Sequence, residues 1–333
     1  MRMLGIALLA ACGTPTPPAP SVPPPAVVAP ASLERRPVIP MLDGRWIGAG
    51  VCYGAFRDGQ RPGGPGPSTD QLREDLTLLA PRWNLLRVYA SDGPTEPLLA
   101  LIHTEHLPFR VLVGAWIAGV ETPPAEAAIA NQAQVDNAIR LANAYPDEVL
   151  GVVVGNETQV SWTAHRVDRD ALIGHIRAVR AATKAPVATA DDFSYWLTPE
   201  SDPVAAEVDF IVSHAYAMWN GKPLDDAMAW TKAQHAAVVA RHPGVPVWLG
   251  EAGWATQRHT EGDQATLIKG EAGEGPQKQF YAAFSTWTTA EKIPSTYFEA
   301  FDEPWKGGGH PDEVEKHWGL YRVDRTPKAA LAP

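Results

Sequence analysis

Two glutamates, Glu157 and Glu251, each end an apolar run long enough to form a buried strand. The runs are Val149–Gly155 and Val245–Gly250. Two carboxylates can split an acetal: one protonates the leaving oxygen, and the other attacks the anomeric carbon or activates water. Attack needs about 5–5.5 Å between the carboxyl groups and water activation about 6.5–9.5 Å, so the sequence leaves both open. For either glutamate taken alone, a helix cap or an ion pair is the structural alternative.

The elements that must position this pair alternate along the chain. After Gly44, short β-rich apolar runs alternate with longer helical periodicities, which is typical of βα units around a parallel sheet. We expect eight strands, at Ile47–Tyr53, Leu85–Tyr89, Phe109–Trp116, Val149–Gly155, Val187–Ala190, Val208–His214, Val247–Gly250 and Thr296–Phe301. We expect helices at Thr69–Ala80, Ala125–Tyr145, Arg169–Thr183, Leu224–Arg241 and Gly275–Ala290, among others.

Eight strands in about 285 residues predict a fold of the α/β class, a (β/α)8 TIM barrel, rather than a doubly wound sheet. We place this single catalytic domain at residues 44–333. In such barrels the active site lies at the C-terminal ends of the strands. Glu157 and Glu251 end the fourth and seventh expected strands, which face each other across the barrel mouth.

The first 43 residues have a different composition. Residues 1–11 resemble a bacterial lipoprotein signal peptide, because Arg2 precedes a short apolar stretch that ends in Leu-Ala-Ala before Cys12. The resemblance implies lipidation of Cys12 and a protein exported to the cell envelope, in the periplasm or at the outer membrane. An ordinary signal peptide of a secreted protein, or a misassigned start, is the alternative. Residues 12–43 are rich in Pro and Ala, and we expect an extended tether.

Composition excludes several other functions. A net charge of -10 without a basic run disfavours nucleic acid as a partner. Cys52 falls in a buried strand, where an inert thiol is expected. His103 and His106 are expected to be solvated rather than to bind a metal ion, and no phosphate-binding or dinucleotide motif is present. We therefore expect a monomer that uses no metal and no cofactor, with contact to a membrane only through the lipid.

Three segments resemble the signatures of glycoside hydrolase family 17, the β-1,3-glucanases and glucan transglycosylases. They are Val154–Glu157, Gly250–Trp254 and Tyr297–Lys306. Four further runs are similar to this family in the same order along the chain, namely Gly50–Gly54, Arg87–Tyr89, Val208–Ile211 and Trp318–Tyr321. The resemblance covers roughly residues 47–331 and implies a β-glucan substrate.

The resemblance implies a role for each matching residue. Glu157 matches the acid/base and Glu251 the nucleophile of a retaining double displacement. Asn156 matches the residue that hydrogen-bonds the sugar 2-hydroxyl, with a helix cap as the alternative. Tyr216 matches the tyrosine that orients the nucleophile, and simple packing is the alternative.

Other candidates for substrate contact follow strand ends. Glu303 and Lys306 match a pair that binds sugar hydroxyls and helps to keep the nucleophile ionised. Glu299 and Asp302 are candidates for structural partners of barrel-mouth arginines such as Arg87. The remaining candidates for sugar contact are Tyr53, Arg87, Tyr89, Trp116, Trp219, Trp254 and Trp305, and two of the four tryptophans could be core residues instead.

Three alternatives stay open. The glycosyl-enzyme can be attacked by water or by another glucan, and these outcomes share the same catalytic pair. A non-catalytic, glycan-binding envelope lipoprotein is the alternative from another class, although both carboxylates are present. Another barrel glycosidase with a different substrate is the third. The segment His214–Ala217 and the Gly/Pro-rich loop 57–67 depart from the plant members and leave linkage preference and subsite number open.

Overall fold

The structure is a computed structural model that describes residues 33–332. The expected signal peptide, the lipidation site Cys12 and residues 12–32 of the expected tether lie outside the described residues. Nothing in the described part of the chain is a helix long and apolar enough to cross a membrane.

The compact domain begins at Leu33 and not at residue 44. Residues 33–43 belong to it because their polar groups are bound to the barrel. The Arg36 backbone N–H donates to the Asp209 carboxylate at 2.6 Å. The Arg36 guanidinium donates to the carbonyls of Ala185 and Arg180, at 2.9 and 2.7 Å. The expected boundary at residue 44 is therefore too far along the chain, because the domain begins at Leu33.

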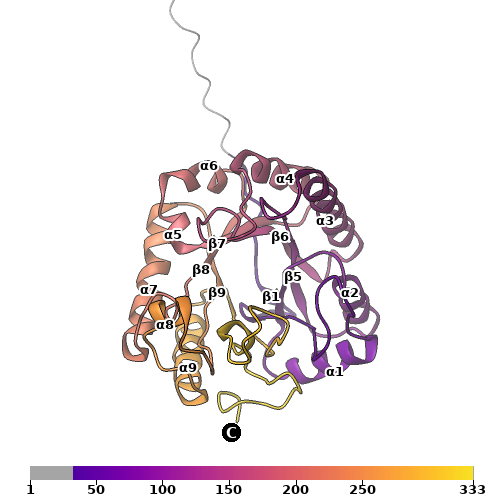
Figure 1. Ribbon diagram of the computed structural model, residues 1–333. Coiled ribbons are helices and arrows are strands. Elements are labelled where there is room, and N and C mark those ends of the chain that lie inside the picture. Colours follow the sequence, from indigo (N-terminus) through magenta and orange to yellow (C-terminus); the bar gives the residue numbers. More distant parts are fainter. Residues whose placement is uncertain (1–32, 333) are drawn as a thin grey trace, which may run out of the picture. The chain divides into compact units, whose positions relative to one another are not determined.

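Eight parallel strands close into a barrel in the described part of the chain, which confirms the expected (β/α)8 fold (Figure 1). The last strand pairs with both the first and the seventh, so that no strand edge is left open. The strands are β3 Ala49–Cys52, β4 Leu85–Val88, β5 Arg110–Ala115, β6 Val149–Asn156, β7 Val187–Asp192, β8 Phe210–His214, β9 Val247–Glu251 and β10 Ser295–Tyr297.

The helices alternate with the strands and ring the barrel (Figure 1). The longer ones are α1 Thr69–Leu79, α2 Thr95–Thr104, α3 Pro124–Ala144, α4 Arg169–Ala182, α7 Leu224–Arg241 and α9 Glu274–Ala290. Short helices lie in the connections: α5 Phe193–Trp196, α6 Asp202–Ala205 and α8 Gly262–Leu267. Local sequence explains the starts of some of them. Ser68 caps α1, because its hydroxyl accepts from the Gln71 N–H while the Gln71 side chain accepts from the Ser68 N–H.

The last expected strand is shorter than its apolar run. It ends at Tyr297 instead of Phe301, because the chain leaves the ladder. The Phe298 N–H donates to the Ala252 carbonyl at 2.9 Å, and Phe301 forms an isolated bridge to Tyr321. This bend carries the segment after β10 over the barrel mouth.

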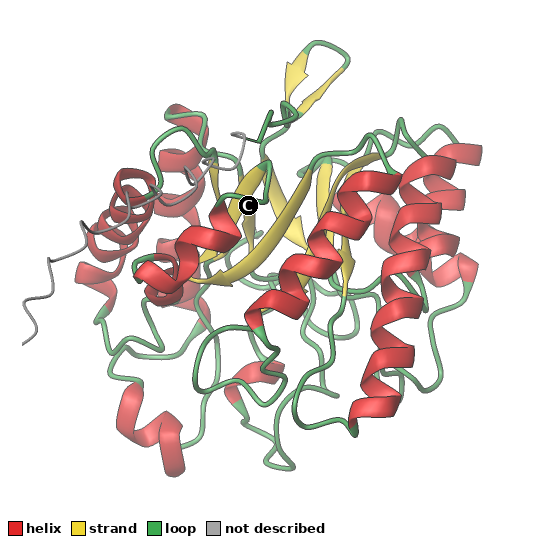
Figure 2. Cartoon of the chain, turned by 90° about the horizontal axis from the view of Figure 1, so that it is seen from above, coloured by secondary structure: helices red, strands yellow, loops and turns green. Residues whose placement is uncertain are grey.

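Two apolar clusters form the core. One fills the barrel interior with side chains such as Leu85, Leu112, Val153, Phe210 and Trp248. The other lies between the strands and the helices. A hairpin of β1 (Met41–Leu42) and β2 (Arg45–Trp46) projects from the end where the barrel strands begin, and the longer connections gather at the opposite end (Figure 2).

Candidate active site

Glu157 and Glu251 lie at the C-terminal ends of two strands. Glu157 follows β6 and Glu251 is the last residue of β9. One oxygen of each carboxylate and one ring nitrogen of His214 all lie within 4.8 Å of one another. Gly155 and Glu157 have positive φ angles of 79° and 50°, so the chain turns sharply where β6 ends. The structure thus brings the two carboxylates together.

Glu251 is held by donors on both oxygens. Arg87 Nη1 donates to its Oε1 at 2.6 Å, and the Tyr216 hydroxyl donates to its Oε2. Burial alone would raise the pKa of Glu251, but the charges of His214 and Arg87 and these two hydrogen bonds outweigh burial and lower the pKa to about 2. Glu251 is therefore ionised at neutral pH, and its donors are positioned as a nucleophile requires.

Arg87 connects Glu251 to Asn156. Its Nη2 donates to Asn156 Oδ1 at 2.6 Å, which turns the amide nitrogen of Asn156 away from the guanidinium. The guanidinium lies 4.6 Å from the centre of the Tyr89 ring. Three candidate residues thus form one array beside Glu251.

The expectation that Glu299 and Asp302 pair with Arg87 is wrong. Lys306 Nζ lies 2.7 Å from Glu299 Oε2 and 2.6 Å from Glu303 Oε2. Asp302 instead pairs with Lys328 at 2.7 Å. The two terminal nitrogens of Arg87 bond instead to Glu251 and Asn156, at the ends of β9 and β6.

Lys306, Glu299 and Glu303 form a buried cluster. Burial and the charge of Glu303 raise the pKa of Glu299 well above its usual value, against the effect of Lys306. Burial would also raise the pKa of Glu303, but Lys306 and hydrogen bonds from Glu299, Lys306 and Trp305 lower it. We interpret the cluster as Lys306 paired with ionised Glu303, with the proton on Glu299. The dominant influences on Glu251 are His214 and Arg87 rather than Lys306.

Gly54 gives Glu303 its space. A Cβ atom at Gly54 would lie 2.1 Å from Glu303 Oε1. Trp305 Nε1 donates to the same oxygen at 2.9 Å, and the Trp305 side chain is 39% exposed. The Glu303 carboxylate therefore occupies the space that a side chain at position 54 would fill.

The other aromatic candidates fall into two groups. Trp116 is half-buried, with its ring centre 4.7 Å from that of His165 and the two rings tilted by 46°. Trp219 donates from Nε1 to Glu315 at 3.1 Å. Tyr53 and Trp254 are wrong as substrate contacts, because both are buried. The Tyr53 hydroxyl donates to Asp75 of α1, and Trp254 Nε1 donates to the Glu271 carbonyl, so both hold the packing around the barrel.

Two residues at the site were not found from the sequence. His214 ends β8, and its ring lies between Glu157 and Glu251. Its position at a strand end is the same signal that selected the two glutamates. Glu315 lies in the short 3-10 helix Val314–Lys316, away from any strand end. Burial raises its pKa to about 7, although the charge of Lys306 and the hydrogen bond from Trp219 oppose the rise. Its protonation therefore changes near neutral pH beside the catalytic pair.

Glu157, His214 and Glu251 offer the only trio in the described residues with the spacing of a metal site. Both oxygens of Glu251 already accept hydrogen bonds, and one of the donors is the cation Arg87. A second cation would compete with that charge, so we interpret the trio as a hydrogen-bonded catalytic group. His103, by contrast, lies 2.8 Å from Glu148 at the end of α2.

Cys52 lies beneath the site. It is fully buried, and its Sγ donates to the Gly250 carbonyl at 3.3 Å. Burial raises the pKa of the thiol to about 11. The expectation of an inert thiol is confirmed, since the thiol and not the reactive thiolate is present at neutral pH.

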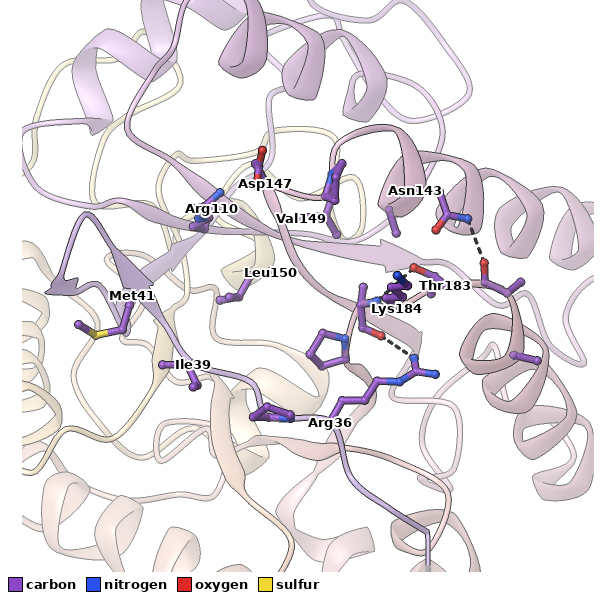
Figure 3. A pocket seen from close by; sticks show the side chains of 17 residues that line it. Arg36, Ile39, Met41, Arg110, Asn143, Asp147, Val149, Leu150, Thr183 and Lys184 are labelled. Atoms are coloured by element: carbon purple, nitrogen blue, oxygen red, sulfur yellow. Dashed lines mark hydrogen bonds between the residues drawn. The ribbon is translucent and has the colours of Figure 1, made fainter.

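A cavity of about 930 Å³ lies at the other end of the barrel. Arg36, Ile39, Arg110, Leu150 and Lys184 are among its lining residues (Figure 3). Several of these precede or begin barrel strands. The cavity is therefore separate from the carboxylates.

The fold is a (β/α)8 barrel, and two neighbouring carboxylates lie at the C-terminal ends of its fourth and seventh strands. Residues 50–319 match the BtgE/BtgC glycoside hydrolase domain, and the chain belongs to this family. The resemblance to glycoside hydrolase family 17 is thereby confirmed.

Relatives and solved structures agree with this family. A glucan 1,3-beta-glucosidase of Arthroderma benhamiae is 28% identical over 81% of this chain and 86% of its own length. An endo-laminarinase structure from Formosa Hel1_33_131 has a TM-score of 0.72 at 25% identity, over 85% of both chains. The glycoside hydrolase family 17 beta-1,3-glucanosyltransferase from Rhizomucor miehei has a TM-score of 0.65 at 26% identity, over 85% of this chain and 96% of its own.

Proposed function

We propose that this protein cleaves β-1,3-glucan with retention at the anomeric carbon, through a covalent glycosyl-enzyme. One observation carries retention: an oxygen of Glu157 and an oxygen of Glu251 lie within 4.8 Å of each other. Inverting pairs lie about 6.5–9.5 Å apart because a water must fit between the sugar and the base. Support for the substrate comes from the relatives, which are named for 1,3-beta-glucan and laminarin.

The two carboxylates take different roles because their surroundings differ. Glu251 is 6% exposed, ionised, and held by donors on both oxygens, which suits attack on the anomeric carbon. Glu157 is 25% exposed, and among the described side chains only His214 is hydrogen-bonded to its carboxylate, which suits a group that gives and takes a proton. Asn156 and the Lys306 cluster line the same mouth and are proposed to bind sugar hydroxyls.

The stereochemical outcome tests the mechanism. Laminari-oligosaccharides are digested while proton NMR follows the anomers as they form. The β-anomer is expected first, with the α-anomer rising only by mutarotation. An initial α-anomer would show inversion and contradict the proposed double displacement.

Azide rescue tests the two roles. Glu251→Ala is expected to be inactive and to regain turnover with azide as an α-glycosyl azide, because azide then attacks in place of the carboxylate. Glu157→Ala is expected to form the β-glycosyl azide on the glycosyl-enzyme when the leaving group is activated. Glu200→Ala removes an exposed carboxylate away from the pair and is the control. Equal activity of Glu251→Ala and Glu200→Ala would refute the assignment.

Transfer to a second glucan is the other outcome of the same chemistry. The structural relative from Rhizomucor miehei is named as a beta-1,3-glucanosyltransferase, which supports this candidate. After the glycosyl-enzyme forms, either water or a sugar hydroxyl attacks it, and the affinity of the acceptor side decides between them. Products longer than the starting oligosaccharide would identify a transferase, and shorter products alone would identify a hydrolase.

We also propose that the chain is exported as a monomer and anchored to the bacterial envelope by lipid on Cys12. The proposal rests on Arg2 and on the Leu-Ala-Ala sequence before Cys12. Radiolabelled palmitate should enter the wild type and Cys52→Ser but not Cys12→Ser when each is expressed in a bacterium. Label in Cys12→Ser would contradict the anchor. Light scattering of the detergent-free domain measures the oligomeric state.

A further inference from the structure

His214 lies between the two carboxylates. It ends β8 and its side chain is fully buried. Its Nδ1 lies 2.9 Å from Glu157 Oε1, and its Nε2 lies 3.3 Å from Glu251 Oε1. Within the part of the chain that the structure describes, no other side chain hydrogen-bonds to the Glu157 carboxylate.

The ring is fixed in this position by its neighbours. A Cβ atom at Gly250 would lie 3.2 Å from His214 Cδ2, so the glycine lets the imidazole lie against β9. The Ala215 N–H donates to the Glu251 carbonyl at 2.9 Å, which ties the end of β8 to the end of β9. The two carboxylates therefore meet the two ring nitrogens of a side chain with little freedom to turn.

The surroundings of His214 contain more acids than bases. The titratable or charged groups around His214 and the two glutamates are Glu157, Glu251, Asp191, Asp192, Glu315, Arg87, Lys306, Tyr89, Tyr216 and Cys52. Burial and the charge of Glu157 raise the pKa of Asp191 well above its usual value. Burial also raises the pKa of Asp192, against hydrogen bonds from Ser194 and the charge of His214. Among these groups His214 and Glu157 are directly hydrogen-bonded, at 2.9 Å, so one proton can lie between them.

That proton can be bonded either to His214 Nδ1 or to the Glu157 carboxylate. If the imidazole is charged, Nδ1–H donates to Glu157 and Nε2–H faces Glu251. If Glu157 holds the proton, its O–H donates to Nδ1 and the neutral imidazole keeps its Nε2–H toward Glu251. Both arrangements contain the same number of protons and the same heavy-atom positions, so the proton passes over 2.9 Å without a movement of either side chain.

We propose that His214 and Glu157 share one catalytic proton in the free enzyme, where it lies on either His214 Nδ1 or Glu157, and that Glu157 delivers this proton to the leaving oxygen. The inference rests on the proposed acid/base function of Glu157. His214 is thus a positioning residue that acts through Glu157 and does not touch the sugar.

The proton balances over both steps of the reaction. In the first step the Glu157 O–H bond breaks and the leaving oxygen takes the proton, so Glu157 is ionised and His214 is neutral. In the second step water or an acceptor hydroxyl loses a proton to Glu157 as its oxygen attacks the anomeric carbon. The hydrogen bond to His214 then shares that proton again, and the pair is restored.

His214→Asn tests the inference, because an amide can still donate to Glu157 but cannot hold the proton. Two sites that share a proton lose it at a higher pH than either does alone. The basic limb of kcat/KM on laminari-oligosaccharides is therefore expected to move to lower pH in the variant, by about one unit. The dinitrophenolate group of a dinitrophenyl glycoside leaves without protonation, so kcat/KM for that substrate should show no such shift. His235→Asn, a histidine of α7 bonded to the Val247 carbonyl, is the matched control.

If the basic limb of kcat/KM lay at the same pH in His214→Asn and in the wild type, the inference would be overturned. If His214→Asn does not fold, a second experiment takes its place. The wild type and Glu157→Gln are labelled at histidine, and NMR follows the His214 signal as the pH is changed. The His214 signal should change at the midpoint of the wild-type basic limb, and at a lower pH in Glu157→Gln. An unchanged midpoint would also overturn the inference. If the wild type turned over neither the laminari-oligosaccharides nor the dinitrophenyl glycoside, the proposed function itself would be refuted.

Discussion

At the scale of single residues, the ionisation of Glu251 depends on hydrogen bonds as well as on charges. Its pKa falls from 4.5 to about 2, so the ionised form persists until the pH approaches that value. A residue with a lowered pKa loses its active form as the pH falls through the folded-state pKa. Any change that raises this pKa therefore moves the acidic limb of activity to higher pH.

Tyr216→Phe isolates one of these hydrogen bonds. The hydroxyl donates to Glu251 Oε2, and a hydrogen bond to a charged group contributes about 1.5–3 kcal/mol. We expect the acidic limb of kcat/KM to move upward by about one to two pH units, since about 1.4 kcal/mol corresponds to one unit. Tyr281→Phe, a tyrosine of α9, is the control. Identical acidic limbs in all three proteins would contradict the assigned role of Tyr216.

Lys306 neutralises the buried, ionised Glu303 and also bonds to Glu299, so its removal should cost more than one contact. Lys306→Met leaves Glu299 and Glu303 without a cation, and breaking a buried ion pair costs about 3–5 kcal/mol. We expect that loss in the free energy of urea unfolding at pH 7. In Lys306→Met/Glu303→Gln the uncompensated charge is gone, and much of the stability should return. Additive losses in the double variant would argue against the cluster.

At the scale of elements, periodicity predicted the long helices and the barrel strands, because buried strands and amphipathic helices carry it along many residues. The four- and six-residue helices α5, α6 and α8 carry too few residues for a period. Because barrel active sites lie at the C-terminal ends of strands, the sequence could identify Glu157 and Glu251 as candidates. It could not show in which direction each side chain points. Tyr53 and Trp254 follow strands too, yet turn into the core. Contacts between distant segments, such as that of Glu315 with Trp219, leave no local pattern.

The junction of two elements at Gly54 yields a prediction of its own. A Cβ atom there would lie 2.1 Å from Glu303 Oε1, so Gly54→Ala must displace the Glu303 carboxylate from its place beside Lys306 and Trp305. A displacement of about 1 Å in an active site can cost about 100-fold in rate. We expect kcat/KM to fall by at least about tenfold while the protein stays folded by circular dichroism. Gly174→Ala, an α4 glycine with open space around its Cβ, should leave kcat/KM unchanged.

At the scale of the whole molecule, the two ends of the barrel have separate tasks. The C-terminal ends of the strands carry the carboxylates, whereas residues 33–46 cross the other end near the cavity of Figure 3. The buried Asp209 carboxylate accepts from Arg36 and Val187 backbone N–H groups and from Arg180. The separation predicts that changes at this end alter stability and leave catalysis unaffected.

Arg36→Ala tests that separation in the full chain. The variant loses the guanidinium hydrogen bonds to the carbonyls of Ala185 and Arg180, at 2.9 and 2.7 Å, and leaves both acceptors near the end of α4 without this donor. Each hydrogen bond from a charged group contributes about 1.5–3 kcal/mol when buried, and partial exposure here reduces the expected total loss to about 2 kcal/mol. Urea unfolding measures that loss. Under conditions where the variant is fully folded, its kcat/KM should equal the wild-type value. Arg45→Ala, an exposed arginine of β2 at the same end, should change neither quantity. Equal stability of the Arg36 and Arg45 variants would mean that residues 33–43 lie against the barrel without holding it together.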